Sequence, residues 1–447
     1  MESFEQRTGL VLPGGGARGA YQVGVLKAIS DIQGRVNRSP FSVISGTSAG
    51  AINASMISSR IEDFHQSILN LENVWINFST DRIYKTEKLF MLKQSLHWLL
   101  TLISGGVLTK NPRSLLDNQP LRDLLEETID FDSIEKNISS GVLDALIITA
   151  ASYEKKQSVS FFSTSDDVDN WKKVGRLGRQ SKIDIDTLMA SVALPLIFPA
   201  VMINGHYYGD GAMRQETPLS PAIRLGATNL LIISTESSGD DSKQQSGMEY
   251  PNISEIGGYI LDGLFSGSLY SDLERLDRIN QVIAQNEKQK VYTKTKEMRH
   301  IDYLVISPSK DINQIAMSCY DDIPLSIRTL FRGIGINKDN DSELLSFLLF
   351  ESRFSKYLIE LGFQDAMRRK EEIGSFLISY SRNRVASPRK VTKPNTSVSV
   401  VIITPLANAG SIPTLFNTKG MVTPAIADAN IFSSIEAPTI IPISQLV

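Results

Sequence analysis

The chain of 447 residues is poor in the two side chains that most often build metal sites and catalytic bases. It has one cysteine, Cys319, which excludes an intrachain disulfide and a zinc cluster built on several thiolates. Its four histidines lie far apart, and none is paired at the spacing of metal ligands: His65, His97, His206 and His300. A hydrolase with this sequence therefore has few histidines from which to take a base.

Long apolar runs and an excess of positive charge are also missing. No run of about 18 apolar residues occurs, so no transmembrane helix is expected. The first seven residues carry two acids before any base, which does not fit a secretory signal. We therefore expect a cytoplasmic protein that touches membranes only at their surface. With 46 basic and 49 acidic side chains the net charge is −3, which does not favour nucleic acid as a partner.

Short apolar runs alternate with helical patterns over most of the chain. The runs expected to form strands are 9–12, 41–45, 143–149, 230–234 and 303–306. The patterns expected to form helices are 20–32, 49–59, 183–193 and 344–361. This alternation predicts an α/β fold with a mostly parallel sheet.

The composition changes after about residue 380. Residues 381–393 carry five bases and no acid, whereas residues 394–447 hold three charged side chains and six of the 18 prolines. Closely spaced prolines exclude long helices and central strands. We expect residues 381–447 to form an extended or disordered tail, which could act as a docking arm or as a linker.

The first motif with chemical meaning is Gly14-Gly15-Gly16-Ala17-Arg18-Gly19, which follows an expected strand and opens an expected helix. Gly14, Gly16 and Gly19 fit the dinucleotide fingerprint G-x-G-x-x-G. The same glycines also suit an oxyanion loop, because they let backbone N–H groups approach a substrate at the positive end of a helix. A tight strand-to-helix turn is the third interpretation.

The second motif, Gly46-Thr47-Ser48-Ala49-Gly50, matches the nucleophile elbow G-x-S-x-G between a strand and a helix. A dinucleotide site would require an acid at the end of this second strand, and the sequence has Gly46 and Ser48 instead. A phosphate-binding P-loop would require a Lys-Ser/Thr pair after Gly19, which is also absent. The two motifs together favour acyl transfer.

A serine nucleophile needs a base, and none of the four histidines lies in a convincing loop after a strand. Asp210 offers another solution, because it stands in Gly209-Asp210-Gly211-Ala212 at the end of a strand-like run. An acid between two glycines is open to close approach by another group. A plain turn is the alternative, since Asp-Gly is common in turns.

These three motifs, in this order and spacing, resemble the signatures of the patatin-like phospholipases, and residues 189–195 resemble the small-residue, proline-stopped helix of that family. The resemblance covers roughly residues 8–310, and the helical stretch to about 380 is similar to bacterial members. It implies a three-layer α/β/α fold with a catalytic domain at 8–310. Residues 311–380 would form a helical portion packed on that domain.

The resemblance also implies a Ser-Asp dyad, with Ser48 as the nucleophile and Asp210 as the base. Burial of Asp210 would raise its pKa and make it a better base. The oxyanion hole is then expected at Gly14, Gly15, Gly16, Arg18 and Gly19, with backbone N–H groups as donors and Arg18 fixing the loop or adding positive charge. The nucleophile elbow is expected at Gly46, Thr47, Ala49 and Gly50.

The implied reaction is hydrolysis of fatty-acyl esters of phospholipids or lysophospholipids, without a metal or cofactor. Transient contact with a membrane surface is expected, and the oligomeric state stays open. The alternative is a catalytically silent module on the same fold that binds lipid or a partner. Residues 81–113 are basic, aromatic and amphipathic, so they could lie in a membrane interface or pack over the sheet as an ordinary helix. The glycine-containing apolar stretch 253–269 could form a flap.

Overall fold

The computed structural model describes residues 6–85, 101, 114–236, 253–265, 267–288, 299–333, 336 and 343–384. The chain divides into two units, Met1–Ser387 and Pro388–Val447, and every described residue belongs to the first. Most of the basic amphipathic stretch 81–113, and residues 385–447 of the expected tail 381–447, lie outside the described residues, whereas 381–384 end a helix instead of starting an extended tail. The predictions made for those two segments therefore stay predictions.

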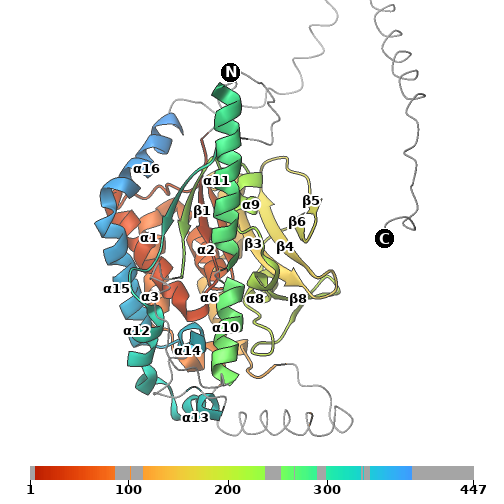
Figure 1. Ribbon diagram of the computed structural model, residues 1–447, viewed down its shortest axis with the longest axis vertical. Helices are drawn as coiled ribbons and strands as arrows, with labels where there is room; N and C mark the ends of the chain where they lie inside the picture. Colours follow the sequence, from red (N-terminus) through yellow and green to blue (C-terminus); the bar gives the residue numbers. More distant parts are fainter. Residues whose placement is uncertain are drawn as a thin grey trace, which may run out of the picture. The chain divides into compact units, whose positions relative to one another are not determined.

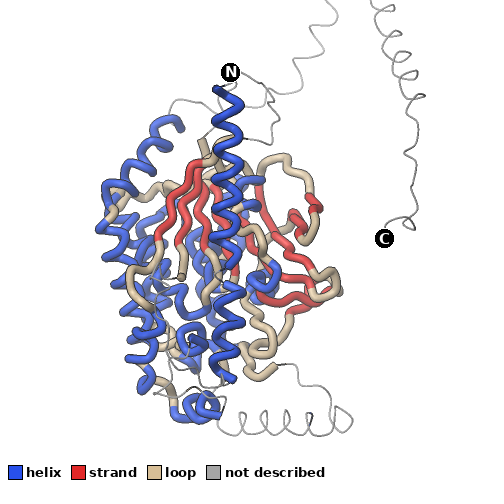
Figure 2. Tube along the Cα trace, viewed as in Figure 1, coloured by secondary structure: helices blue, strands red, loops and turns tan. Residues whose placement is uncertain are grey.

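A single mixed sheet is the centre of the described structure (Figure 2). Its strands are β1 Thr8–Leu12, β2 Val43–Thr47, β3 Ala145–Ser152, β4 Gln157–Thr164, β5 Trp171–Lys173, β6 Arg176–Gln180, β7 Val201–Ile203, β8 His206–Asp210, β9 Asn229–Ile233 and β10 Asp302–Ile306.

The central strands run parallel, in the order β10-β9-β1-β2-β3. On the far side of β3 the sheet continues through β4, which is antiparallel to β3, then β6, which is parallel to β4, and β5, which is antiparallel to β6. The end of β3 also pairs with β8, which pairs with β7. The parallel centre confirms the predicted sheet, and it aligns the carboxyl ends of β1, β2 and β3 along one edge.

Helices cover both faces of this sheet. They are α1 Ala20–Ile32, α2 Ala49–Ser59, α3 Phe64–Ile76, α4 Thr80–Ile83, α6 Gln119–Thr128, α7 Phe131–Ser139, α8 Ile185–Ser191, α9 Ser220–Arg224, α10 Ile253–Phe265, α11 Gly267–Lys288, α12 Ile312–Ser318, α13 Leu325–Gly333, α14 Glu343–Leu348, α15 Ser352–Arg368 and α16 Lys370–Arg384. Four short 3-10 helices complete the list: η1 Gly16–Gly19, η2 Ile61–Asp63, η3 Gly211–Arg214 and η4 Tyr320–Asp322.

The side chains of β1 show how the three layers arise. Successive residues of a strand point to opposite faces, and both faces of β1 are apolar. Leu10 and Leu12 join the core that contains side chains of α1, α2 and α15, whereas Val11 joins the core beneath α9 and α11. Helix α11 crosses the face of the sheet that points toward the viewer (Figure 1). The predicted three-layer α/β/α fold is confirmed.

Helix α15, from the expected helical portion 311–380, packs against α1 at very short range. A Cβ atom on Gly24 would lie 1.9 Å from the Ile359 carbonyl oxygen, and one on Gly362 would lie 2.3 Å from the Tyr21 carbonyl oxygen. Neither position has room for a larger residue, so the two helices touch backbone to backbone. This contact supports the proposal that the C-terminal helices dock on the α/β body.

Most expected elements occur within a few residues of their predicted ends, and 20–32 and 49–59 match α1 and α2. The single helix predicted over 344–361 is wrong, because residues 349–351 separate α14 from α15. Leu349 and Phe350 are buried in the core, and Glu351 is extended. The apolar spacing continues across this break, so it could not reveal the break. Among the described residues, no helix is long and apolar enough to cross a membrane.

Candidate active site

Two loops meet at the carboxyl ends of the paired parallel strands β1 and β2, where Leu12 is the partner of Gly46. The loop after β1 carries the glycine motif and enters η1, and the turn after β2 carries Ser48 and enters α2. In open α/β sheets, ligands bind outside the carboxyl ends of the strands. The sequence motifs therefore converge at the edge of the sheet where a ligand is expected.

Ser48 adopts a backbone conformation that non-glycine residues rarely occupy, with φ 54° and ψ −126°. Such conformations cost about 1–3 kcal/mol and cluster at functional sites. The turn also brings α2 against β1, since a Cβ atom on Gly50 would lie 2.0 Å from the Leu12 carbonyl oxygen. The geometry is that of the predicted nucleophile elbow, with Ser48 at its tip.

The hydroxyl of Ser48 donates a hydrogen bond of 2.6 Å to Oδ2 of Asp210. Asp210 is the last residue of β8 and pairs with Ala150 of β3. Its second oxygen, Oδ1, accepts a hydrogen bond of 2.9 Å from the backbone N–H of Ala212. The structure thus brings together the serine and the acid that the sequence singled out.

Burial makes this carboxyl group a stronger base than a free aspartate. Asp210 is 0% exposed and Ser48 is 3% exposed. Desolvation raises the pKa of Asp210 from 3.8 to about 7, although the hydrogen bonds from Ser48 and Ala212 act in the opposite direction. Ionised and neutral Asp210 therefore coexist near neutral pH, as a general base requires.

The last residue of α8 and the segment that follows it hold both members of the pair in place. The backbone N–H of Ser48 donates to Oγ of Ser191 at 2.9 Å, and Ser191 Oγ donates to the Thr149 carbonyl oxygen at 2.7 Å. Two residues later, the Ala193 carbonyl oxygen accepts the backbone N–H of Asp210 at 2.8 Å. The sequence indicated 189–195 only through its resemblance to the family and did not identify Ser191. The one feature that could have pointed to Ser191 is its place among small residues.

The glycine loop lies directly against the serine. A Cβ atom on Gly14 would be 3.0 Å from Cβ of Ser48 and 2.5 Å from the ring of Phe265. Thr235 Oγ1 donates to the Gly14 carbonyl oxygen at 2.8 Å, so the N–H of Gly15, in the same planar trans peptide, points the opposite way. Within the described part of the chain, the N–H groups of Gly14, Gly15 and Gly16 form no hydrogen bond. They remain available as donors, and sequence reasoning missed Thr235.

The side chain of Arg18 contacts the C-terminal helices α12 and α14. Its Nε donates to Ser346 of α14 at 2.8 Å, and its guanidinium donates to Asn313 of α12 at 2.9 Å and lies over the Phe347 ring. Burial lowers its pKa to about 10, so it stays charged at neutral pH. Of the two expectations for this residue, these contacts support fixing the loop.

The remaining motif residues pack the two loops together. Gly19 stands against Ala49 and the ring of Trp75. Thr47 donates its hydroxyl to Oε1 of Gln215 at 2.7 Å. The stretch considered as a flap forms α10 and the start of α11, and Phe265, the last residue of α10, stacks on Phe347 of α14. This aromatic pair borders the glycine loop next to the serine.

Histidine takes no part in the described contacts of Ser48. His65 contacts Ser30, and His206 contacts Glu154 at 2.5 Å. His300 lies 3.4 Å from Asp302, and His97 is outside the described residues. In the ranges that the structure describes, no group of three or more His, Cys, Asp or Glu side chains is placed to hold a metal ion. Among the described residues, the side chains that hydrogen-bond to Ser48 are those of Asp210 and Ser191.

The site thus combines, on a three-layer α/β/α fold, a serine at a strained turn, a buried acid and a glycine loop whose N–H groups are unpaired among the described residues. Residues 10–223 match the family model described as patatin-like phospholipase. The chain therefore carries a patatin-like phospholipase domain, a member of a family of lipid acyl hydrolases, which confirms the resemblance read from the motifs.

Two solved structures show what the fold is similar to. VipD from Legionella pneumophila is 14% identical over 84% of this chain and 67% of that chain, with a TM-score of 0.33. Human GIVD cytosolic phospholipase A2 is 10% identical over 86% of this chain, with a TM-score of 0.41. This chain spans 61% of the length of that human chain. In the comparison with curated proteins, none matched.

Proposed function

We propose that this protein hydrolyses fatty-acyl esters of phospholipids or lysophospholipids through a Ser48–Asp210 dyad. The observation that carries the proposal is the 2.6 Å hydrogen bond from Ser48 Oγ to a carboxylate that burial has made basic. A general base has to lie within hydrogen-bond reach of the proton that it abstracts, and Asp210 meets this condition.

In the first half of the reaction, Asp210 takes the hydroxyl proton while Ser48 Oγ attacks the ester carbonyl carbon. The carbonyl oxygen gains negative charge, which the N–H groups of the Gly14–Gly16 loop would stabilise. Donors already oriented toward a developing oxyanion contribute about 3–4 kcal/mol each. The alcohol leaves with the proton from Asp210, and an acyl group remains on Ser48.

In the second half, water attacks the acyl-enzyme and Asp210 accepts a proton from it. The fatty acid is released, and the proton returns to Ser48. Ser191 would act as a positioning residue, because it fixes the backbone N–H of Ser48 to β3 and so fixes the direction of the hydroxyl. Arg18 would hold the loop to α12 and α14 without contacting the substrate.

The alternative is a catalytically silent module that binds lipid or a partner. Such a module does not require a basic carboxylate beside a serine. Reaction with a fluorophosphonate probe separates the two functions, because the probe labels only an activated serine. We expect one labelled peptide, containing Ser48, in the full-length protein and none in Ser48→Ala. Ser59→Ala is the matched control, since Ser59 is a buried serine of α2 that donates to the Met56 carbonyl oxygen.

We expect the probe to label the Ser59→Ala control and not Ser48→Ala. We also expect the wild type to release fatty acid from a defined phospholipid mixture. The released acyl chains and the remaining lysolipids then identify the acyl position and head group that the enzyme prefers. A folded wild-type protein that takes up no probe and releases no fatty acid would favour the binding module instead.

A further inference from the structure

A cavity with a volume of about 480 Å³ lies on the face of the sheet covered by α9 and α11. It shares no lining residue with the Ser48–Asp210 site. Its lining contains five charged side chains from four parts of the chain: Arg176 of β6, Arg224 of α9, Asp272 and Arg275 of α11, and Arg299. Four positive charges therefore face one acid.

That acid is already engaged within the protein. Asp272 is buried, and its Oδ2 accepts a hydrogen bond of 3.0 Å from the backbone N–H of Leu219. Its Oδ1 lies 3.8 Å from Arg275, the edge of ion-pair distance. The lining keeps a formal charge of +3, although the whole chain carries −3.

The other three arginines are held by neutral groups. Arg299 donates to the carbonyl oxygens of Ile223 and Ala227 at 2.6 and 2.8 Å, and its Nε is buried with no partner. Arg176 donates to the Thr217 hydroxyl, and Arg224 lies 5.7 Å from the centre of the Trp171 ring. In the described part of the chain, no carboxylate lies within 4.0 Å of these three guanidinium groups.

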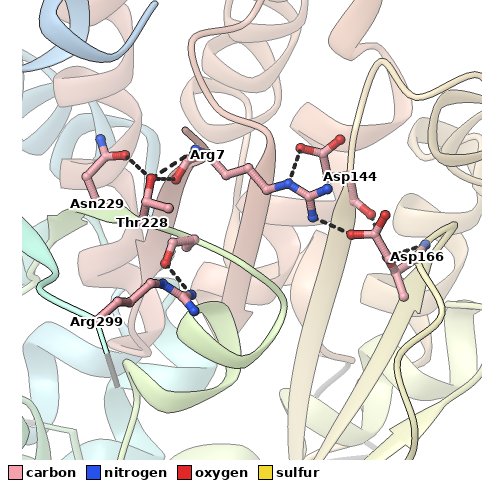
Figure 3. A network of polar contacts seen from close by, with 8 residues as sticks. Arg7, Asp144, Asp166, Thr228, Asn229 and Arg299 are labelled. Atoms are coloured by element: carbon pink, nitrogen blue, oxygen red, sulfur yellow. Dashed lines mark hydrogen bonds and ion pairs between the residues drawn. The ribbon is translucent and has the colours of Figure 1, made fainter. Parts of the chain in front are cut away.

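Burial and neighbouring arginines both act on the pKa values of these groups. Burial, Arg224 and Arg275 lower the pKa of Arg176, while Asp272 and Glu216 act in the opposite direction. Burial and Arg7 lower the pKa of Arg299. Figure 3 shows that Arg7 itself turns toward Asp144 and Asp166, which bind its guanidinium. Two carboxylates therefore balance the charge of Arg7, whereas the four cavity arginines share one carboxylate of the described lining, that of Asp272.

Four guanidinium groups around one cavity repel one another, and a bound anion would relieve this repulsion, most of all for the partly buried Arg176 and Arg299. Guanidinium groups form paired hydrogen bonds with phosphate oxygens, and such charge-assisted bonds are about twice as strong as neutral ones. The rest of the lining includes apolar side chains of Leu219, Ile223, Leu276 and Ile279. Cavities of roughly 300–1,000 Å³ with an apolar wall and a few convergent polar groups are typical of small-molecule sites.

We propose that the cavity between α9 and α11 binds an organic phosphate, with the phosphate on Arg176, Arg224, Arg275 and Arg299 and the organic part on the apolar wall. Two kinds of ligand carry such a phosphate group: a free phosphate ester and the head group of a lipid. The site is separate from the proposed hydrolytic dyad, so it can exist whether or not Ser48 is catalytic.

The test is calorimetric titration of the full-length protein with glycerol 3-phosphate and with pyrophosphate, at an ionic strength fixed with sodium chloride. Saturable binding is expected for the wild type. Arg224→Gln and Arg275→Gln should each weaken it by about tenfold or more, because each removes charge-assisted hydrogen bonds. Arg275→Lys should give an intermediate loss, since it keeps the charge and removes the fork.

Arg278→Gln is the matched control. Arg278 lies on the same helix, is 78% exposed on its side chain and pairs with Glu274 at 3.3 Å, but it does not line the cavity. It should bind both probes as the wild type does. Thermal unfolding checks that each variant is folded, and Arg275→Gln, at an exposed position, keeps the test valid if Arg224→Gln unfolds.

Flotation with phosphatidylcholine vesicles containing phosphatidic acid distinguishes the two sources. Binding of the soluble probes alone identifies a free phosphate ester, and vesicle binding that Arg275→Gln abolishes identifies a lipid head group. Absence of binding in both arms, or equal loss in Arg278→Gln and Arg275→Gln, overturns the proposal.

Discussion

The hydroxyl of Ser48 lies 2.6 Å from a carboxylate oxygen of Asp210, although 162 positions separate the two residues in the sequence. Ser48 reaches this point at the end of β2, and Asp210 at the end of β8. Strand β4 fills one edge of β3, and β2 and β8 share the other edge: β2 pairs with 145–149 and β8 continues along 150–152. The pair is therefore positioned by the sheet itself, and its properties give the following predictions.

The rate of ester hydrolysis should depend on one ionisation near neutral pH. Asp210 acts as a base only when ionised, and burial raises its pKa to about 7. We expect kcat/KM to rise about tenfold per pH unit below this value and to level off above it. The measurement is kcat/KM from pH 5 to 9 with a soluble p-nitrophenyl ester. A flat profile between pH 5.5 and 8 would contradict a buried, basic Asp210.

The same ionisation should make the Asp210→Asn variant more stable than the wild type at high pH. The folded state holds the proton of Asp210 more tightly than the unfolded state, so the wild type loses stability as the pH rises from about 4 to about 7. Asn keeps the shape without the charge. Its advantage in unfolding free energy should be near zero at pH 4 and reach about 2–4 kcal/mol above pH 7. Urea unfolding at both pH values measures it, and an advantage that does not grow with pH would refute the prediction.

Ser48→Gly and Ser48→Ala should differ in stability although both lack the hydroxyl. Ser48 has a φ of 54°, which alanine tolerates poorly and glycine adopts freely. The glycine variant should therefore be more stable by about 1 kcal/mol. Thermal unfolding of the two variants side by side tests this. Equal stability would mean that the elbow carries no strain.

Ser191→Ala should slow catalysis more than it weakens substrate binding. The change removes the acceptor of the Ser48 N–H and the link to the Thr149 carbonyl oxygen. We expect kcat to fall about tenfold to a hundredfold with little change in KM, and stability to fall by about 1–2 kcal/mol. Ser55→Ala is the control, because Ser55 is a buried serine of α2 whose hydroxyl has no partner among the described residues. Equal effects of the two substitutions would contradict a positioning role for Ser191.

The sequence predicted the fold and singled out Ser48 and Asp210, because the strands, the helices and the motifs around these two residues are local patterns. The glycine turns after β1 and β2 are short-range features, and Asp210 stands in a recognisable strand end. The residues that orient the site were missed for the opposite reason. Ser191 and Thr235 contact the loops from positions 143 and 221 residues away, and an isolated Ser or Thr has no signature of its own.

The break between α14 and α15 was missed because the apolar spacing is the same on both sides of it. Arg18 shows a related limit. The motif predicted its place in the loop, but its partners Asn313 and Ser346 lie about 300 residues further along the chain. Only the docking of the C-terminal helices decides where its charge points.

Fatty acid release by Asp210→Asn tests the central claim most directly. The substitution preserves the size of the side chain and an oxygen that can accept the Ala212 N–H, and it removes only the base. With phosphatidylcholine vesicles at pH 8, the wild type should release fatty acid, and folded Asp210→Asn should be slower by a factor of about 10³ or more. Release by folded Asp210→Asn at a rate close to that of the wild type would contradict the Ser48–Asp210 dyad.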